Sequence, residues 1–187
     1  DAELIIGVRG PIDLAGIEAQ LVRQVVTPGE AWLVPARTVH AIGAGVLLYE
    51  IQQPSHVTWR IYDWGRDREI HVEQALHVAI PDQLATRQCA RASGDGWEDL
   101  IRSDYFTVQR VRVDADRPTV LSAEPTSVRV LTVIAGELQI GETIVTRGQS
   151  AVLAAAMADA TIIGSGVALL AGLPPDVLTA PDCVDAD

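Results

Sequence analysis

The sequence predicts a mainly β protein built from two related β units with a short helical insertion between them. Short segments rich in Val, Ile, Leu and Thr recur along the chain and are separated by Gly, Pro or Asp. Apolar residues make up 48% of the 187 residues, enough for one sizeable core or two smaller ones. An internal repeat relates the two halves. Many evenly spaced short strands are typical of a sandwich or a barrel.

The expected strands, in chain order, are ELIIGV, AWLVP, VLLYEIQQ, VTWRIYDW, FTVQRVRVD, VRVLTVIAG, ELQIG, TIVTRG, SAVLAA, ATIIG and VALLAGL. Helical pieces are expected at 13–22 and, within 69–102, at HVEQALHVAI and GWEDLIR. These elements divide the chain into a first β unit at 1–68, a helical connector at 69–103 and a second β unit with a C-terminal tail at 104–187.

The repeat aligns residues 28–42 with 147–161, and residues 43–53 with 164–174. The polar positions of the first copy are not kept in the second. Asp159 stands where His40 does, Ala171 where Glu50 does, and Leu173 where Gln52 does. Because a related strand folds without Glu and Gln, we expect these residues to serve a site in the first unit.

Charge and composition exclude several classes of function. The net charge of −11 argues against nucleic acid and anionic membrane surfaces as partners. All basic residues are Arg, so the chain supplies no lysine for a Schiff base. Cys89 and Cys183 form no spaced motif and fit reduced thiols of a cytoplasmic protein. No apolar run approaches membrane-spanning length.

A polar cluster is expected on a hairpin formed by VLLYEIQQ and VTWRIYDW. Side-chain alternation places Leu48, Glu50 and Gln52 on one face of the first strand, and Thr58, Arg60 and Tyr62 on one face of the second. A turn at Pro54, Ser55 and His56 would put Glu50 across from Arg60. A polar inner face is costly unless it is paired or functional. The cluster is therefore either a site or a buried Glu–Arg pair that fixes the hairpin register.

The spacing from Gly29 through Pro35 and Arg37 to His40 resembles the second conserved motif of the cupin superfamily. In that motif the last His is a metal ligand, and Gly usually stands at the position of Arg37. A structural or surface role for His40 is the alternative. More specifically, VPARTVHAIGAGVLLYEIQQ, TWRIYDWGR and REIHVEQAL closely resemble type I phosphomannose isomerases, and the resemblance runs over about residues 1–172.

The resemblance implies two cupin-like jelly-roll (double-stranded β-helix) units. Residues 1–68 would be the C-terminal part of the metal-binding unit, and the second unit would be degenerate. The implied activity is that of a cytoplasmic, zinc-dependent aldose–ketose isomerase interconverting mannose 6-phosphate and fructose 6-phosphate. His40 would ligate Zn²⁺, Arg60 and Glu50 would be catalytic, and Gln52 and Tyr62 would bind substrate.

The other zinc ligands of that family are a Gln, a His and a Glu from upstream motifs. DAELIIGV resembles the segment just after them, so the chain is expected to be a partial one. Its partners would be a sugar phosphate and the N-terminal part of the same enzyme. The alternative function is a noncatalytic cupin-type module that binds a sugar or a metal.

Overall fold

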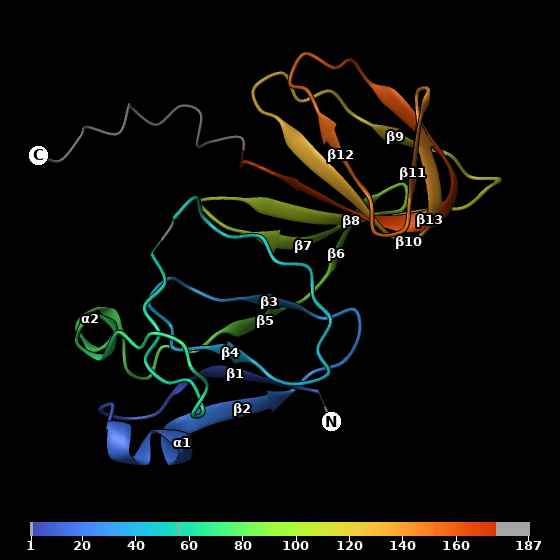
Figure 1. Cartoon of the computed structure of the whole chain (residues 1–187). Helices are drawn as coiled ribbons and strands as arrows, with labels where there is room; N and C mark the ends of the chain where they lie inside the picture. Colours follow the sequence, from blue (N-terminus) through green and yellow to red (C-terminus); the bar gives the residue numbers. More distant parts are fainter. Residues whose placement is uncertain (1, 56, 175–187) are drawn as a thin grey trace, which may run out of the picture. The chain divides into compact units, whose positions relative to one another are not determined.

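The computed structural model describes residues 2–55 and 57–174, which divide between two compact units, Asp1–Gln88 and Cys89–Asp187 (Figure 1). The predicted mainly β architecture is confirmed, because antiparallel sheets dominate both units. The division falls inside the segment 69–103. The expected turn residue His56 and the C-terminal tail from residue 175 lie outside the described residues.

The first unit holds two small sheets and its helices. One sheet has the order β2-β1-β4, and the other pairs β3 with β5. The elements are β1 (Glu3–Val8), the 3-10 turn η1 (Leu14–Gly16), α1 (Ile17–Gln20), β2 (Leu21–Val25), β3 (Ala31–Leu33), β4 (Ala41–Ile42), α2 (Val72–Val78) and β5 (Thr86–Gln88). The buried apolar residues of this unit are Ile5, Ile6 and Val8 on β1, together with Ile17, Ala75 and Ala85.

The second unit is built on one larger sheet of order β11-β10-β13-β8-β7-β6, with β12 also paired to β10 and β9 to β13. Its strands are β6 (Arg91–Gly94), β7 (Trp97–Arg102), β8 (Thr107–Val113), β9 (Thr119–Leu121), β10 (Arg129–Ile140), β11 (Thr143–Thr146), β12 (Ser150–Leu153) and β13 (Ala160–Gly172). Apolar side chains from these strands form one buried cluster, with Val111, Leu131, Val133 and Leu138 among its members.

Two of the three helical predictions are borne out at least in part. HVEQALHVAI contains α2, and 13–22 contains η1 and α1 before the chain turns into β2 at Leu21. The helix expected at GWEDLIR is wrong, since Trp97–Arg102 is strand β7. A cross-strand ion pair favours the strand: Arg110 Nε on β8 lies 2.7 Å from Glu98 Oε2, directly opposite on β7.

The strands expected at VLLYEIQQ and VTWRIYDW are also wrong, because the described residues of both segments lie outside any strand. In the second unit the aligned residues 164–172 lie in β13, which is hydrogen-bonded to β10 on one edge and β8 on the other. In the first unit only the first residues of the segment aligned with β13, Ala41 and Ile42, form a strand, and this strand, β4, pairs with β1. A two-stranded hairpin without further partners is marginally stable in water, so these segments do not form one.

The internal repeat is confirmed in local geometry. Gly29 and Gly148, at aligned positions, have positive φ of 92° and 86°. β3 and β12 start at aligned residues, two after each Gly. Each strand is followed by the same turn. In the first copy a hydrogen bond closes this turn, in which Thr38 N–H donates to Pro35 O at 3.2 Å. In the second copy Met157 N–H donates to Ala154 O at 3.0 Å.

Gly136 on β10 is the position where the second unit tolerates a side chain least. Its φ is 72°, and a Cβ added there would lie 2.0 Å from the carbonyl oxygen of Ser165 on β13. We expect Gly136→Ala to lower the free energy of unfolding by about 3 kcal/mol, through left-handed strain and overpacking. Gly141 is the matched control, with φ 58° and no atom within 4 Å of an added Cβ. Gly141→Ala should cost only about 1 kcal/mol. Chemical denaturation of both variants measures the difference, and equal costs would contradict the steric argument.

Candidate functional site

The most strongly charged cluster in the first unit surrounds the side chain of Asp63, which is only 1% exposed. Arg68 donates from Nε to Asp63 Oδ2 at 3.0 Å and from Nη2 to Oδ1. Arg66 Nη2 lies 3.1 Å from Asp63 Oδ1, and Arg60 Nε lies 3.8 Å from the same oxygen. One buried carboxylate therefore faces three guanidinium groups, which we call the Asp63 cluster.

A tight turn brings Arg66 back to Asp63. The N–H of Arg66 donates to the carbonyl oxygen of Asp63 at 3.1 Å, and Trp64 and Gly65 between them have positive φ of 50° and 72°. Positive φ at both central residues is type I′ geometry, which a tryptophan adopts only at a cost of roughly 1–2 kcal/mol. Contacts of the Trp64 ring offset this strain. The Arg66 guanidinium lies 5.8 Å from the ring centroid, and the Tyr62 ring meets it edge-on at 5.1 Å.

The Asp63 cluster carries a net positive charge within an acidic chain. Three guanidinium groups and one carboxylate sum to 3 − 1 = +2, whereas the whole chain carries −11. The hydrogen bond from Arg68 lowers the pKa of Asp63, and the charges of Arg66, Arg68 and Arg60 lower it further, against the opposing effect of burial. The side chains of Arg66 and Arg68 remain 59% and 48% exposed. The cluster can therefore offer guanidinium N–H groups to an anion from solvent.

Arg60 is held by several groups, and Glu50 is not one of them. Its Nη1 donates to the carbonyl oxygen of Glu69 at 2.8 Å, and its backbone N–H donates to His71 Nδ1 at 3.3 Å. The expected cross-strand Glu50–Arg60 pair is not formed, because it required a hairpin that the chain lacks. Arg60 instead forms an ion pair with Asp63, which lies three residues further along the same segment.

The other predicted site residues lie apart from this cluster or at its edge. Glu50 and Gln52 are exposed on the segment outside any strand. The hydroxyl of Tyr62 donates to Glu18 Oε1 on α1 at 2.6 Å, and this hydrogen bond raises the pKa of Tyr62. Within the described residues, no hydrogen bond or ion pair joins His40, Glu50, Gln52 and Arg60 to one another.

His40 has the orientation of a possible metal ligand. Its Nδ1 lies 2.8 Å from the carbonyl oxygen of Thr38, which can only accept a hydrogen bond, so in the neutral imidazole Nδ1 carries the proton and Nε2 is the nitrogen with the lone pair. Thr38 is itself buried, and its hydroxyl oxygen accepts a hydrogen bond from Gln83 Nε2 at 2.7 Å. A catalytic zinc takes about three protein ligands. No group of three His, Cys, Asp or Glu side chains able to hold a metal occurs in the described part of the chain. His40 alone does not make a zinc site.

Sequence reasoning missed Asp63, Arg66 and Arg68. Strand alternation assigned Asp63 to the face opposite Arg60, and this assignment holds only if the segment is a strand. The informative signal was YDWGRDR, where a Trp-Gly pair sits between an aspartate and two arginines. A turn at Trp-Gly brings residues three and five positions after Asp63 back to its carboxylate.

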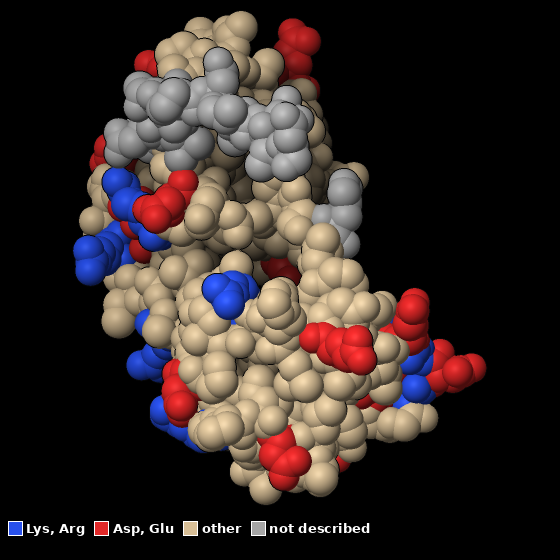
Figure 2. Space-filling model, turned by 90° about the vertical axis from the view of Figure 1, so that its left-hand side faces the viewer, with Lys and Arg blue, Asp and Glu red and all other residues tan. Residues whose placement is uncertain are grey.

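On the face shown in Figure 2, acidic and basic side chains form small mixed groups among uncharged residues. Among the described residues, no helix has both the length and the apolar character needed to cross a membrane.

Comparison with known proteins points to one kind of enzyme. No protein-family model matches the chain. The chain is 32% identical over 130 residues to the probable mannose-6-phosphate isomerase GmuF of Bacillus subtilis, covering 60% of this chain and 41% of that protein. It is 44% identical over 101 residues to the mannose-6-phosphate isomerase ManA of the same organism, covering 48% of this chain and 31% of that protein. The chain thus spans less than half the length of either relative.

Solved structures agree. The crystal structure of the mannose 6-phosphate isomerase from Bacillus subtilis matches with a TM-score of 0.78 and 26% identity, over 91% of this chain and 60% of that one. A phosphomannose isomerase from Salmonella typhimurium matches with a TM-score of 0.63 and 20% identity, over 84% of this chain and 42% of that one, which shows the shared fold alone.

The Asp63 cluster gives a pH-dependent stability that can be measured. Because the pKa of Asp63 is lowered on folding, its ionised form stabilises the protein above the unfolded pKa of about 4, and this stability is lost as pH falls through the folded pKa. We expect Asp63→Asn to destabilise the protein at neutral pH, and the gap from the unsubstituted protein to narrow below about pH 4.

Thermal unfolding from pH 7 to pH 3 measures this gap. Asp67→Asn is the matched control, because it removes the same charge from an exposed aspartate in the same segment. A pH-independent gap for Asp63→Asn, or an equal effect of Asp67→Asn, would contradict the assigned role of Asp63.

Proposed function

Because this chain is related to mannose-6-phosphate isomerases, we propose that it forms part of a zinc-dependent aldose–ketose isomerase that interconverts mannose 6-phosphate and fructose 6-phosphate. The Asp63 cluster is the observation that carries this proposal beyond similarity. A sugar phosphate is an anion, and an acidic chain needs a local cationic site to attract it. Arg66 and Arg68 supply that site with exposed guanidinium groups.

The proposed reaction moves a proton between C1 and C2 of the sugar through a cis-enediol(ate). Arg60 stabilises the negative charge that develops on the enediolate oxygen, since a guanidinium is permanently charged and donates several hydrogen bonds. Asp63 orients Arg60 for this role at 3.8 Å. Glu50 moves the proton between the sugar oxygens, and Gln52 and Tyr62 contact the sugar.

Zinc enters this proposal through a single ligand of the chain. The free Nε2 of His40 suits a divalent metal. The remaining ligands would come from the N-terminal part of the same enzyme, as the additional length of the relatives suggests. The described residues do not hold a metal by themselves.

A noncatalytic sugar- or metal-binding module is the second candidate. The exposed position of Glu50, away from any hydrogen-bonded strand, favours it. The two candidates differ in turnover. A chimera in which residues 1–172 replace the structurally matched segment of the Bacillus subtilis mannose 6-phosphate isomerase tests the enzyme directly in a coupled assay with mannose 6-phosphate.

Turnover by the chimera that is lost on Arg60→Gln supports the isomerase. A folded chimera that binds zinc but shows no turnover supports the binding module. Circular dichroism and metal analysis of the same preparations establish folding and zinc content.

For the 187-residue chain alone, we expect weak zinc affinity and little or no isomerase activity, since catalytic zinc usually takes about three protein ligands. Dialysis against zinc followed by metal analysis and the same coupled assay measures both properties. Stoichiometric, tightly bound zinc with turnover near that of ManA would show that this chain assembles its site differently.

The anion-binding role of the Asp63 cluster can be tested without turnover. We expect inorganic phosphate to shift the NMR signals of residues 60–71, and Arg66→Gln to weaken phosphate binding about threefold to tenfold, in a manner that fades with added salt. Arg147→Gln, an exposed arginine of the second unit, is the matched control. Equal losses in both variants would mean that only net charge matters.

A further inference from the structure

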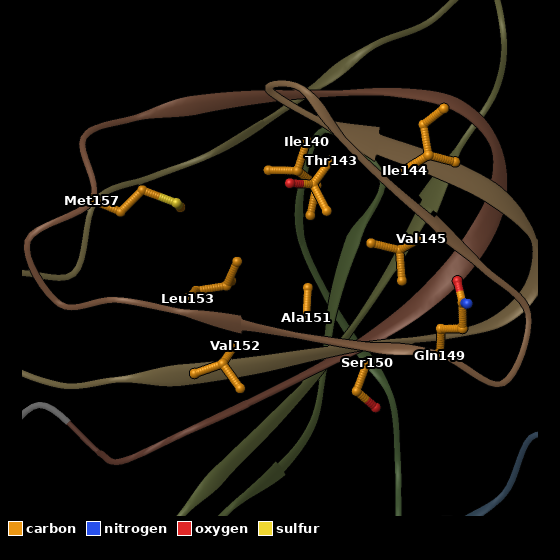
Figure 3. A pocket seen from close by; sticks show the side chains of 10 residues that line it. All are labelled: Ile140, Thr143, Ile144, Val145, Gln149, Ser150, Ala151, Val152, Leu153 and Met157. Carbon is orange, nitrogen blue, oxygen red and sulfur yellow. The ribbon is translucent and has the colours of Figure 1, made fainter.

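The second unit contains a cavity of about 610 Å³ that the proposed function does not use (Figure 3). It lies between β11 and β12. Both strands pair with β10, β11 along Glu137–Ile140 and β12 along Arg129–Thr132. The two strands are joined through Arg147–Gln149 and have no ladder between them among the described pairings, so an opening is left between them.

The inner wall of the cavity is apolar, whereas its open rim carries the exposed polar residues Thr143 and Gln149. Figure 3 shows the side chains of Val145, Ala151, Leu153 and Met157 directed toward a common space, whereas Ser150 and Val152 point away from it. Val145 and Leu153, together with Ile140, are buried members of the core cluster. None of the lining residues is charged.

The polar residues of the lining are largely engaged elsewhere. Gln149 Oε1 accepts hydrogen bonds from the N–H and the hydroxyl of Thr146, and the Ser150 hydroxyl pairs with that of Thr132 at 2.8 Å. Thr143 shares the Val145 face of β11 by strand alternation and brings a hydroxyl to the exposed edge. The cavity thus combines an apolar inner wall with several polar groups at its open rim.

The repeat shows what is missing from this space. Ala151 stands at the position that Trp32 holds in the first unit, and Gln149 at the position of Glu30. Trp32 is partly buried on β3, and its indole N–H donates to Glu30 Oε2 at 3.1 Å. The second unit keeps the strand and its turn but replaces the indole with a methyl group. The backbone of β12 and its following turn therefore matches that of β3, but the indole side chain is absent.

We propose that this cavity binds a small, neutral aromatic molecule, which occupies the space that an indole would fill. The volume lies within the range of roughly 300–1,000 Å³ typical of small-molecule sites. An aromatic ring would displace water from the apolar wall of this open cavity, and the Met157 sulfur adds a favourable contact with a ring. A sugar phosphate is excluded, because its charge would be desolvated without a counter-ion. The site is thus independent of the proposed isomerase function.

Free indole is the probe. We expect titration of the 187-residue chain with indole to shift the methyl signals of Val145, Leu153 and Met157 saturably, with nuclear Overhauser contacts between indole and Met157. Ala151→Leu fills the cavity and should weaken indole binding about tenfold or more. Val152→Leu is the matched control, because Val152 is 73% exposed and points away from the cavity; it should leave binding unchanged.

Several outcomes overturn the proposal. These are the absence of saturable shifts at the cavity residues, equal binding by the Ala151→Leu variant, and competition by mannose 6-phosphate for the same signals. Self-association of the chain through the exposed Ile144 and Val152, seen by sedimentation and covering the opening, would also overturn it. The Overhauser contacts to Met157 are measured in the unsubstituted protein and do not depend on the folding of any variant.

Discussion

A β-strand needs a hydrogen-bonding partner for its backbone, and this requirement decides how each copy of the repeat folds. In the second unit β13 pairs with β10 along Ile162–Ala171, and its other edge pairs with β8 along Gly166–Gly172. The aligned chain in the first unit begins as the short strand β4 on β1 and then continues without a ladder through the described residues that follow. Similar sequences thus give a core strand in one unit and an open segment in the other. Backbone pairing, more than side-chain propensity, separates them.

Where the ladder is missing, side chains order the chain instead. The Asp63 cluster closes residues 60–68 on themselves through one carboxylate and three arginines, and the Trp64–Gly65 turn brings the segment round. Guanidinium groups suit this role, since their planar fork can bond a carboxylate and still present N–H groups outward. The chain has no lysine, so arginine alone provides its cationic chemistry. The same interactions that order the segment create the cationic site on which the proposed function depends.

The sequence predicted what depends on local pattern and missed what depends on partners. The repeat was visible from Gly29 and Gly148, because a positive φ demands glycine at both positions. α2 followed from its helical periodicity. GWEDLIR was read as helical because a short mixed segment fits either period, and only its pairing with β8 selects a strand. Asp63 was placed on the wrong face because alternation was applied to a segment that no neighbouring strand keeps extended.

The two copies of the repeat differ both in their polar side chains and in the size of their apolar side chains. At one aligned position the first unit keeps His40, held by the Thr38 carbonyl, and the second has Asp159, whose carboxylate accepts the N–H of Ala123 at 2.6 Å. That hydrogen bond commits Asp159 to tying the loop before β10 to the start of β13, whereas the ring of His40 keeps one nitrogen for another partner. At another aligned position the first unit has Trp32 and the second has Ala151, which lines the cavity between β11 and β12. A sheet whose strands are well paired can keep its fold when a large interior side chain is replaced by a small one, since the strand ladders persist around the cavity. The candidate functional site therefore lies in the unit with fewer strand ladders, and the cavity lies in the unit with more.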